Sequence, residues 1–273
     1  MVTGTYDLSR RAHLLYLPGL SFREYLNIKT GQKFSSVTLE DLLQHHQKMA
    51  ATFSSVRTLQ HYFEEYKLFG YYPIVFQDRD RLYDAIANVI DKTIYEDIAN
   101  FYNLKTQNLS CFKRIINFFG SIPPGKINTN NIARHLGIDN KTAEHYLKVL
   151  QKTSMIKMLY PVAHGAHVLG KFAKCYLDNT TLLAAVNAML STSLETGTQR
   201  ELFFLQSVQG AKLPVFYPNQ GDFQIQKYIF EVGGKNKDGS QLRSLKTENF
   251  LVKDDILIGS KNEIPLYLFC FLY

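Results

Sequence analysis

Residues 128–152 read NTNNIARHLGIDNKTAEHYLKVLQK, and this stretch decides the fold of the middle of the chain. Thr129 or Asn130 can cap a first helix, whose apolar residues recur at helical spacing. Gly137 permits the left-handed turn that ends it, and Asn140 can cap a second helix. Helix, tight glycine turn and helix is the helix-turn-helix pattern.

The flanking segments extend this pattern to a winged helix. An apolar-rich helix over 111–119 precedes it, and residues 156–162 and 173–177 read as two strands joined by a turn. Polar residues of the helix pair could reach bases or phosphates from a major groove. The candidate nucleic-acid-binding residues are Arg134, Lys141, Thr142, His145, Lys148 and Lys152. Winged helices also dock proteins, so a protein-interaction module, antitoxin-like or for assembly, stays an alternative.

Charge is distributed unevenly along the chain. The 273 residues carry a formal net charge of +7. Eleven lysines and arginines lie between Lys105 and Cys175 against only Asp139 and Glu144, so that segment carries +9 and the remainder −2. A basic module in a near-neutral chain is typical of a protein that binds a phosphate backbone, with DNA as the expected partner. The alternative is a lysine-rich face that only contacts solvent.

Composition indicates a globular chain of two or three small domains. Hydrophobic residues make up 45% and charged residues 20%. No apolar run approaches the roughly 18–20 residues of a membrane span, and the first residues lack a signal-peptide pattern. The three cysteines are scattered, which fits a reducing cytoplasm. We therefore expect a cytoplasmic protein with no membrane partner.

Secondary-structure patterns predict a multidomain α+β fold. The N-terminal half is mostly helical, including all of 36–103, and the winged helix-turn-helix follows it. After Ser193 the pattern becomes α/β, with a helix over about 198–209. Strands are expected at 214–217, 222–225, 228–232 and 266–272.

The first residues resemble part of a known family. A strand over 12–17 leads into Pro18-Gly-Leu-Ser-Phe-Arg-Glu-Tyr-Leu26, with a helix expected over 21–28. This is similar to the end of the ATPase core, with its "PLSFxEFL" helix, in prokaryotic AAA-type ATP-binding proteins. Gly70-Tyr-Tyr-Pro73 stands where that family has a "GGYP" turn. The resemblance implies a core remnant (1–35), a helical subdomain (36–103), a winged helix (104–178) and a restriction-endonuclease-like α/β domain (179–273).

The nucleotide-binding half of that family is not found in this sequence. No G-x-x-x-x-G-K-[ST] loop occurs in it, so we do not expect this chain alone to bind or hydrolyse ATP. The chain looks like the C-terminal part of such a protein, either excised from it or encoded by a truncated gene. The resemblance implies that Arg10 and Arg11 could reach the nucleotide of a neighbouring subunit, with ATPase subunits or self-association as partners. The alternative is that Arg10 and Arg11 are exposed or structural arginines that contact no nucleotide.

The same resemblance implies a nuclease-like centre in the last domain. Asp222 and Glu231 match the two acids that would hold Mg²⁺ and act in catalysis, with Glu201 as a third acid and Lys235 as the lysine. The usual spacing is Glu-x-Lys, because residues two apart share a strand face. Gly233 stands at that lysine position here. The departure favours a non-catalytic nucleic-acid-binding or regulatory chain, with a Mg²⁺-dependent DNA nuclease as the alternative.

Overall fold

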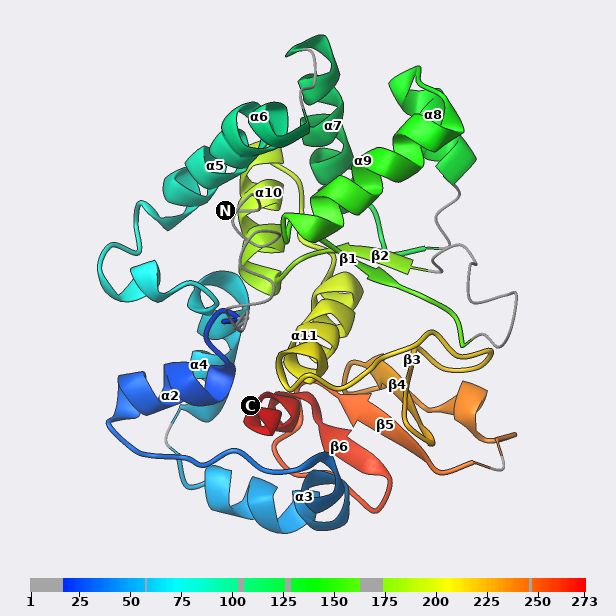
Figure 1. Cartoon of the computed structure of the whole chain (residues 1–273). Helices are drawn as coiled ribbons and strands as arrows, with labels where there is room; N and C mark the ends of the chain where they lie inside the picture. The colour runs from blue at the N-terminus through cyan, green and yellow to red at the C-terminus, as the bar shows by residue number, and fades with distance from the viewer. Residues whose placement is uncertain (1–16, 57, 103–105, 126–128, 163–173, 246) are drawn as a thin grey trace, which may run out of the picture.

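The computed structural model describes residues 17–56, 58–102, 106–125, 129–162, 174–245 and 247–273, and these form a mixed α and β protein (Figure 1). The elements up to the middle of the chain are the helices α2 (Phe22–Thr30), α3 (Leu39–Phe53), α4 (Leu59–Glu65), α5 (Leu82–Lys92), α6 (Ala99–Tyr102), α7 (Thr106–Ser121), α8 (Thr129–Leu136) and α9 (Asn140–Lys152). Shorter turns interrupt or extend them: the π-helical η1 (Tyr66–Gly70) and η3 (Thr93–Ile98), and the 3₁₀ turn η2 (Pro73–Phe76). The predicted helical N-terminal half is confirmed in the described residues.

The remaining elements alternate between strands and helices. They are β1 (Ile156–Leu159), β2 (Lys174–Leu177), α10 (Thr180–Leu190), α11 (Thr196–Gly210), β3 (Phe223–Ile225), β4 (Tyr228–Gly233), η5 (Ser240–Leu242), β5 (Asn249–Lys253), β6 (Glu263–Pro265) and η6 (Leu266–Leu272). None of the described helices combines the length and apolar character that crossing a membrane requires.

Helix α2 begins where the sequence predicts it, because Ser21 and Glu24 form a capping box. The Ser21 hydroxyl accepts from the backbone N–H of Glu24, and the Glu24 carboxylate accepts from the N–H of Ser21 at 2.8 Å. Gly31 ends the helix with φ +69°. The predicted strand over 12–17 falls outside the described residues apart from its last residue, Leu17.

The middle of the chain has the predicted helix pair and hairpin. Gly137, with φ +71°, forms the turn between α8 and α9, and the N–H of Ile138 donates to Ala133 O at 3.0 Å. Asp139, and not the predicted Asn140, caps α9 by accepting from the N–H of Thr142, and Asn140 is the first residue of the helix. Strands β1 and β2 pair antiparallel, with Ile156 opposite Leu177. In Figure 1, this hairpin lies at the lower end of α9.

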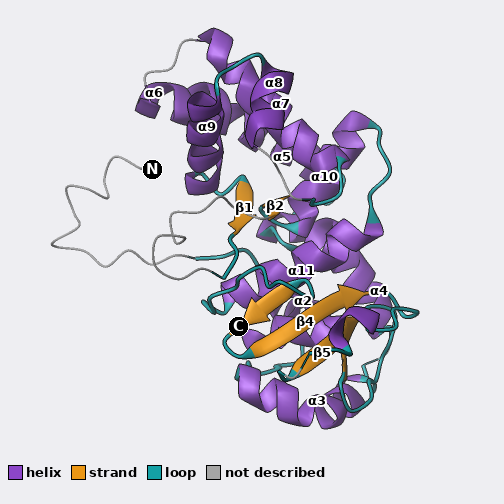
Figure 2. Ribbon diagram, turned by 90° about the vertical axis from the view of Figure 1, so that its right-hand side faces the viewer, coloured by secondary structure: helices purple, strands orange, loops and turns teal. Residues whose placement is uncertain are grey.

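The C-terminal part contains a mixed sheet in the order β3-β4-β5-β6. Strands β3 and β4 form an antiparallel hairpin, and β5 and β6 continue the sheet in parallel. Helix α11 packs against β4 and η6, while α3 packs against β6 and η6 (Figure 2). The chain thereby brings an N-terminal helix to the C-terminal sheet.

Two of the predicted strands differ in the structure. Residues 214–217 form only isolated bridges, of Phe216 with Gln224 and of Tyr217 with Pro161. Residues 266–272 are buried as expected, but they form the 3₁₀ segment η6 rather than a strand. A short apolar run buried on all sides has the same sequence pattern in either conformation, so packing decides between them.

One buried apolar core runs through the described parts of all four predicted domains. The rings of Phe53 and Phe271 stack at a centroid distance of 4.1 Å, and the N–H of Val37 donates to Phe271 O at 2.8 Å. Arg23 Nε donates to the carbonyl of Tyr273, also at 2.8 Å. These contacts join both ends of the described chain, and the three predicted domain boundaries stay predictions.

Candidate functional site

An acidic pair lies where the hairpin meets the C-terminal sheet. Glu201 comes from the first turns of α11, and Asp222 directly precedes β3. One ammonium contacts both: Lys174 Nζ, at the start of β2, lies 2.8 Å from Glu201 Oε2 and 3.2 Å from Asp222 Oδ1. The Tyr176 hydroxyl also donates to Glu201 Oε2, and the N–H of Val232 donates to Asp222 Oδ2. A cation of the protein itself therefore holds this carboxylate pair.

Burial and neighbouring charge have opposite effects on the pKa values of Lys174 and Glu201. Burial alone would lower the pKa of Lys174, but the negative charges of Glu201 and Asp222 outweigh it and raise that pKa. Burial also raises the pKa of the Glu201 carboxyl, with a smaller contribution from the charge of Asp222 and opposition from Lys174. The raised pKa of Lys174 favours its charged form, whereas the raised pKa of Glu201 means that burial makes its carboxylate less favourable than in water. In this arrangement Glu201 and Asp222 do not fit a magnesium ion, because Lys174 takes up the space and the charge between them.

Glu231 forms a second contact beside this pair. Its side chain is buried, and neither carboxylate oxygen accepts a hydrogen bond of good geometry from the part of the chain that the structure describes, although Lys237 Nζ lies 2.9 Å from Oε1. Burial would lower the pKa of Lys237, but close contact with Glu231 and the charges of Asp222 and Glu201 raise it. The structure therefore brings Asp222, Glu231 and Glu201 into one charged cluster.

The lysine of this cluster is not the one expected. Lys235 is exposed and faces a different cavity, of about 340 Å³, beside Asp254 and Asp255. Lys237 occupies the position in the cluster where Lys235 was expected, because Gly233 has no side chain to fill it. A Cβ built on Gly233 would lie 2.7 Å from Lys237 Cγ, so the stem of Lys237 fills the space where a Glu-x-Lys lysine would begin.

A second acidic group lies beside that other cavity. Single carboxylate oxygens of Glu64, Asp254 and Asp255 lie within 4.8 Å of one another. Lys67 Nζ contacts Glu64 at 2.7 Å and Asp254 at 2.9 Å. Arg200 contacts Asp254 at 3.0 Å and Asp255 at 2.8 Å. Each of the three acids therefore forms an ion pair with Lys67 or Arg200, and the group is a structural ion-pair network.

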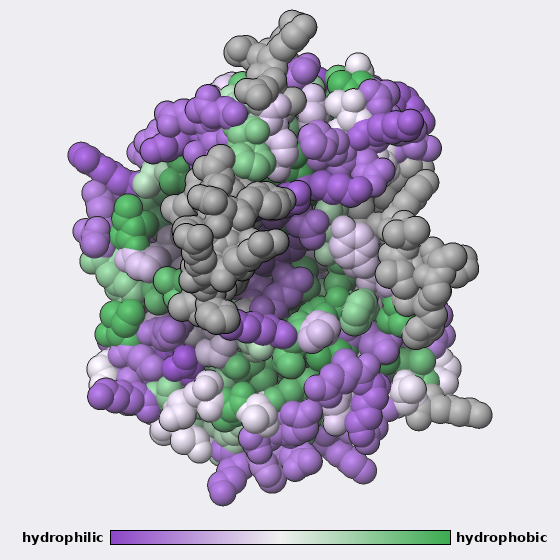
Figure 3. Space-filling model, viewed as in Figure 1, coloured by the Kyte–Doolittle hydropathy of each residue, from purple (hydrophilic) through white to green (hydrophobic). Residues whose placement is uncertain are grey.

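Four of the five predicted nucleic-acid-binding residues of α9 lie along one stripe. Lys141, His145, Lys148 and Lys152 are spaced four, three and four residues apart, which places them on one helix face, and all four are exposed. The ring of Tyr102 meets His145 edge-on at 5.7 Å and borders the stripe. Hydrophilic residues cover much of the upper part of the molecule in Figure 3, where α8 and α9 lie.

Only some of the basic residues are available to a ligand. Lys148 pairs with Glu144 at 2.7 Å, and Lys113 pairs with Asp91 at 2.7 Å. Lys157 pairs with Asp178, and Lys174 with the acidic pair. Arg134, Lys141 and Lys152 are exposed and form no ion pair with any described residue.

Thr142 supports the N-cap of α9: its hydroxyl donates to the capping carboxylate of Asp139 at 2.6 Å. Arg10 and Arg11 lie outside the described residues, as do Lys105, Lys126 and Lys171 of the basic segment. The free cationic surface of the described module is therefore smaller than its sequence charge indicates.

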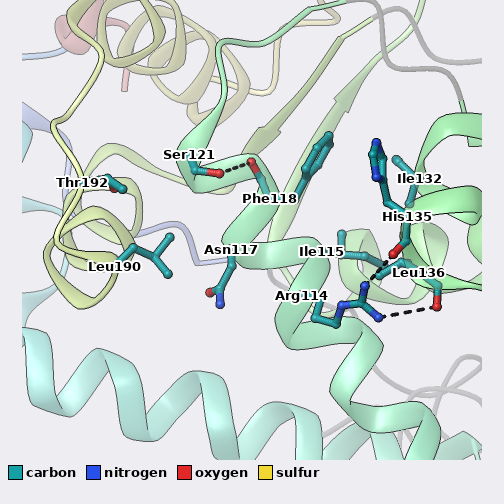
Figure 4. A pocket seen from close by; sticks show the side chains of 10 residues that line it. All are labelled: Arg114, Ile115, Asn117, Phe118, Ser121, Ile132, His135, Leu136, Leu190 and Thr192. Carbon is teal, nitrogen blue, oxygen red and sulfur yellow. Dashed lines mark hydrogen bonds between the residues drawn. The ribbon is translucent and has the colours of Figure 1, made fainter.

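A cavity of about 550 Å³ lies between α7, α8 and the end of α10. Figure 4 shows Leu190 and Thr192 on one side of it and His135 on the other. Arg114 reaches from α7 to the carbonyls of His135 and Leu136, the last residues of α8. This cation stabilises the C-terminal end of α8 through its free carbonyls.

Sequence reasoning missed Lys174, Tyr176 and Lys237. Lys174 and Tyr176 stand two apart on a predicted strand, which places them on one face. That pattern does not identify Glu201 as their partner, because the contact depends on how the hairpin packs on α11. Lys237 lies beyond the Gly233-Gly234 pair and outside the Glu-x-Lys spacing, so that spacing does not point to it.

Comparisons with known proteins give a partial match to a family model and a distant relative. Residues 60–194 match the family described as Domain of unknown function (DUF8612), a range that runs from α4 to beyond α10. The chain is 25% identical over 280 residues to an uncharacterized protein of Methanocaldococcus jannaschii. The alignment covers 94% of this chain and 58% of that protein, so the chain spans a little over half of the relative's length. No solved structure matches the chain significantly.

Proposed function

We propose that this chain is a non-catalytic, nucleic-acid-binding or regulatory module, with residues 104–178 as a winged helix that binds double-stranded DNA. The observation that supports it is the exposed stripe of α9, which carries Lys141, His145, Lys148 and Lys152 on one face. Arg134 adds a free cation from α8. In a helix-turn-helix reader, the second helix presents such side chains to the major groove and to phosphates.

Salt dependence tests the electrostatic part of this proposal. Binding of a 30-base-pair duplex is measured by fluorescence anisotropy between 50 and 200 mM salt. If Arg134, Lys141 and Lys152 each contact one phosphate, affinity falls roughly 40-fold over this range, because each contact releases counterions. Binding that is absent at 50 mM salt, or that does not respond to salt, contradicts the proposal.

Charge reversal tests the location. The double variant Lys141→Glu, Lys152→Glu should weaken DNA binding at least tenfold, since it removes two phosphate contacts and adds repulsion. Lys33→Glu, Lys261→Glu is the matched control, with the same change of charge at exposed sites outside residues 104–178. Equal losses in both variants would show that only net charge matters. If the α9 variant alone loses capture of a protein partner while neither variant affects DNA, the protein-docking alternative holds.

A DNA nuclease is the second candidate, and one observation favours it. Lys237 supplies an ammonium beside Glu231 over Gly233, in a cluster that contains Asp222 and Glu201. In the restriction-endonuclease-like fold that we propose for 179–273, a lysine in this place would stabilise charge at the scissile phosphate. Cleavage of plasmid DNA with Mg²⁺, lost in Asp222→Ala, would place this candidate first. Intact plasmid after prolonged incubation supports the non-catalytic module.

A further inference from the structure

The contact of Lys174 with Glu201 and Asp222 joins two parts of the chain that are separate in sequence. Lys174 begins the returning strand of the hairpin, and its side chain is nine-tenths buried. Its ammonium also lies 5.4 Å from the ring centroid of Tyr217. Tyr217 in turn fixes the outgoing strand, because its N–H donates to Tyr160 O at 2.7 Å and its carbonyl accepts from the N–H of Val162. Both sides of the hairpin are therefore held against the C-terminal part.

The acids around this ammonium form a set that is typical of a divalent-cation site. Carboxylate oxygens suit Mg²⁺ and Mn²⁺, and Mg²⁺ binds them at about 2.0–2.1 Å. Glu201 and Asp222 each place one oxygen on the same nitrogen. Glu231 adds a third acid to this set: it is 0% exposed, and its Oε2 has neither a hydrogen bond nor an ion pair among the described residues.

We propose that Lys174 replaces the divalent cation of this centre, so that the chain keeps the carboxylates without binding a metal ion there. The lysine supplies one positive charge and directional N–H donors to both acids, and it ties the hairpin to α11 and β3. This inference concerns the non-catalytic part of the proposed function and does not depend on DNA binding.

Removing the internal cation should restore a metal site. In Lys174→Met the stem keeps its length while the charge is lost, which leaves two buried carboxylates without their shared partner. Binding of Mn²⁺ is measured by the electron paramagnetic resonance signal of the free ion. We expect the variant to bind Mn²⁺ at least tenfold more tightly than the wild type, and to lose this gain when Asp222→Asn is added. Lys174→Arg, which keeps a cation, should behave as the wild type does.

A control variant tests whether the Mn²⁺ ion binds at the other acidic group instead. Asp255→Asn alters the Glu64–Asp254–Asp255 group at an exposed position and should leave the gained Mn²⁺ site intact. The proposal is overturned if Lys174→Met gains no Mn²⁺ affinity, or if the wild type binds Mn²⁺ and loses it with Asp222→Asn. The wild-type measurement decides the matter by itself should Lys174→Met fail to fold. Loss of DNA binding in any of these proteins tests the proposed function and leaves this result unaffected.

Discussion

At the scale of single residues, buried charge is the feature that constrains this chain most. Lys67 is 1% exposed and Asp254 3% exposed, and their charged atoms lie 2.9 Å apart. Burial would raise the pKa of Asp254, but the charge and hydrogen bond of Lys67, with help from Arg200, lower it overall. Such a buried pair adds little to folding stability compared with apolar packing. Removing one member is nevertheless strongly destabilising, because it leaves a buried charge without a partner.

Asp254→Asn tests this argument through pH. At pH 7 we expect the free energy of unfolding to fall by about 3 kcal/mol, the lower end for a broken buried pair, because Glu64 still contacts Lys67. A lowered pKa means that the contribution of the carboxylate is complete above about pH 4 and disappears as the pH falls through the folded pKa. The difference between variant and wild type should therefore shrink below pH 4 in urea titrations. A loss of the same size at pH 3 and pH 7 would contradict the ion-pair origin.

Asp255→Asn is the comparison for this test. Asp255 contacts Arg200 at 2.8 Å, but its side chain is 54% exposed. Exposed pairs contribute about 0–1 kcal/mol because water screens them. We expect a correspondingly small change at neutral pH.

At the scale of elements, caps fix where helices begin, and the capping box of α2 is the best-defined case. Ser21→Ala removes the oxygen that accepts from the N–H of Glu24. The free energy of unfolding should fall by about 1 kcal/mol, as for other lost N-caps. Chemical denaturation measures this change. Ser36→Ala, at an exposed position outside any helix, should change stability by less than about 0.5 kcal/mol, and an equal effect of both would argue against the cap.

Elements with local signals could be predicted from the sequence, and those set by packing could not. The helix pair around Gly137 carries its own turn residue and a capping side chain, so both helices lie where the sequence predicts them, although Asp139 rather than Asn140 caps the second. The strand β5 over Asn249–Lys253 was missed, because its pairing with β4 across a long connection leaves no local pattern. Asp222 was found by resemblance, whereas Lys174 reaches it from 48 residues away in the sequence.

At the scale of the whole molecule, the described N-terminal helices and the C-terminal segment form one packed unit. Phe271 stacks on Phe53 of α3 and meets Phe34 edge-on at 6.1 Å. Val37 joins this contact through its hydrogen bond to Phe271 O. A helix assigned from sequence to residues 36–103 is thus part of the same core as the end of the chain.

Phe271→Ala tests whether these regions unfold together. Removing a fully buried ring costs about 3–5 kcal/mol, and the cavity it leaves lies between η6 and α3. Hydrogen exchange followed by mass spectrometry should therefore show faster exchange in α3 as well as in η6. Leu257→Ala, at a partly exposed apolar position, is the control and should leave α3 protected. If η6 loses protection while α3 keeps it, the two regions unfold as independent units. The predicted domain boundaries at 35/36 and 178/179 would then describe how the chain folds, in spite of the shared core.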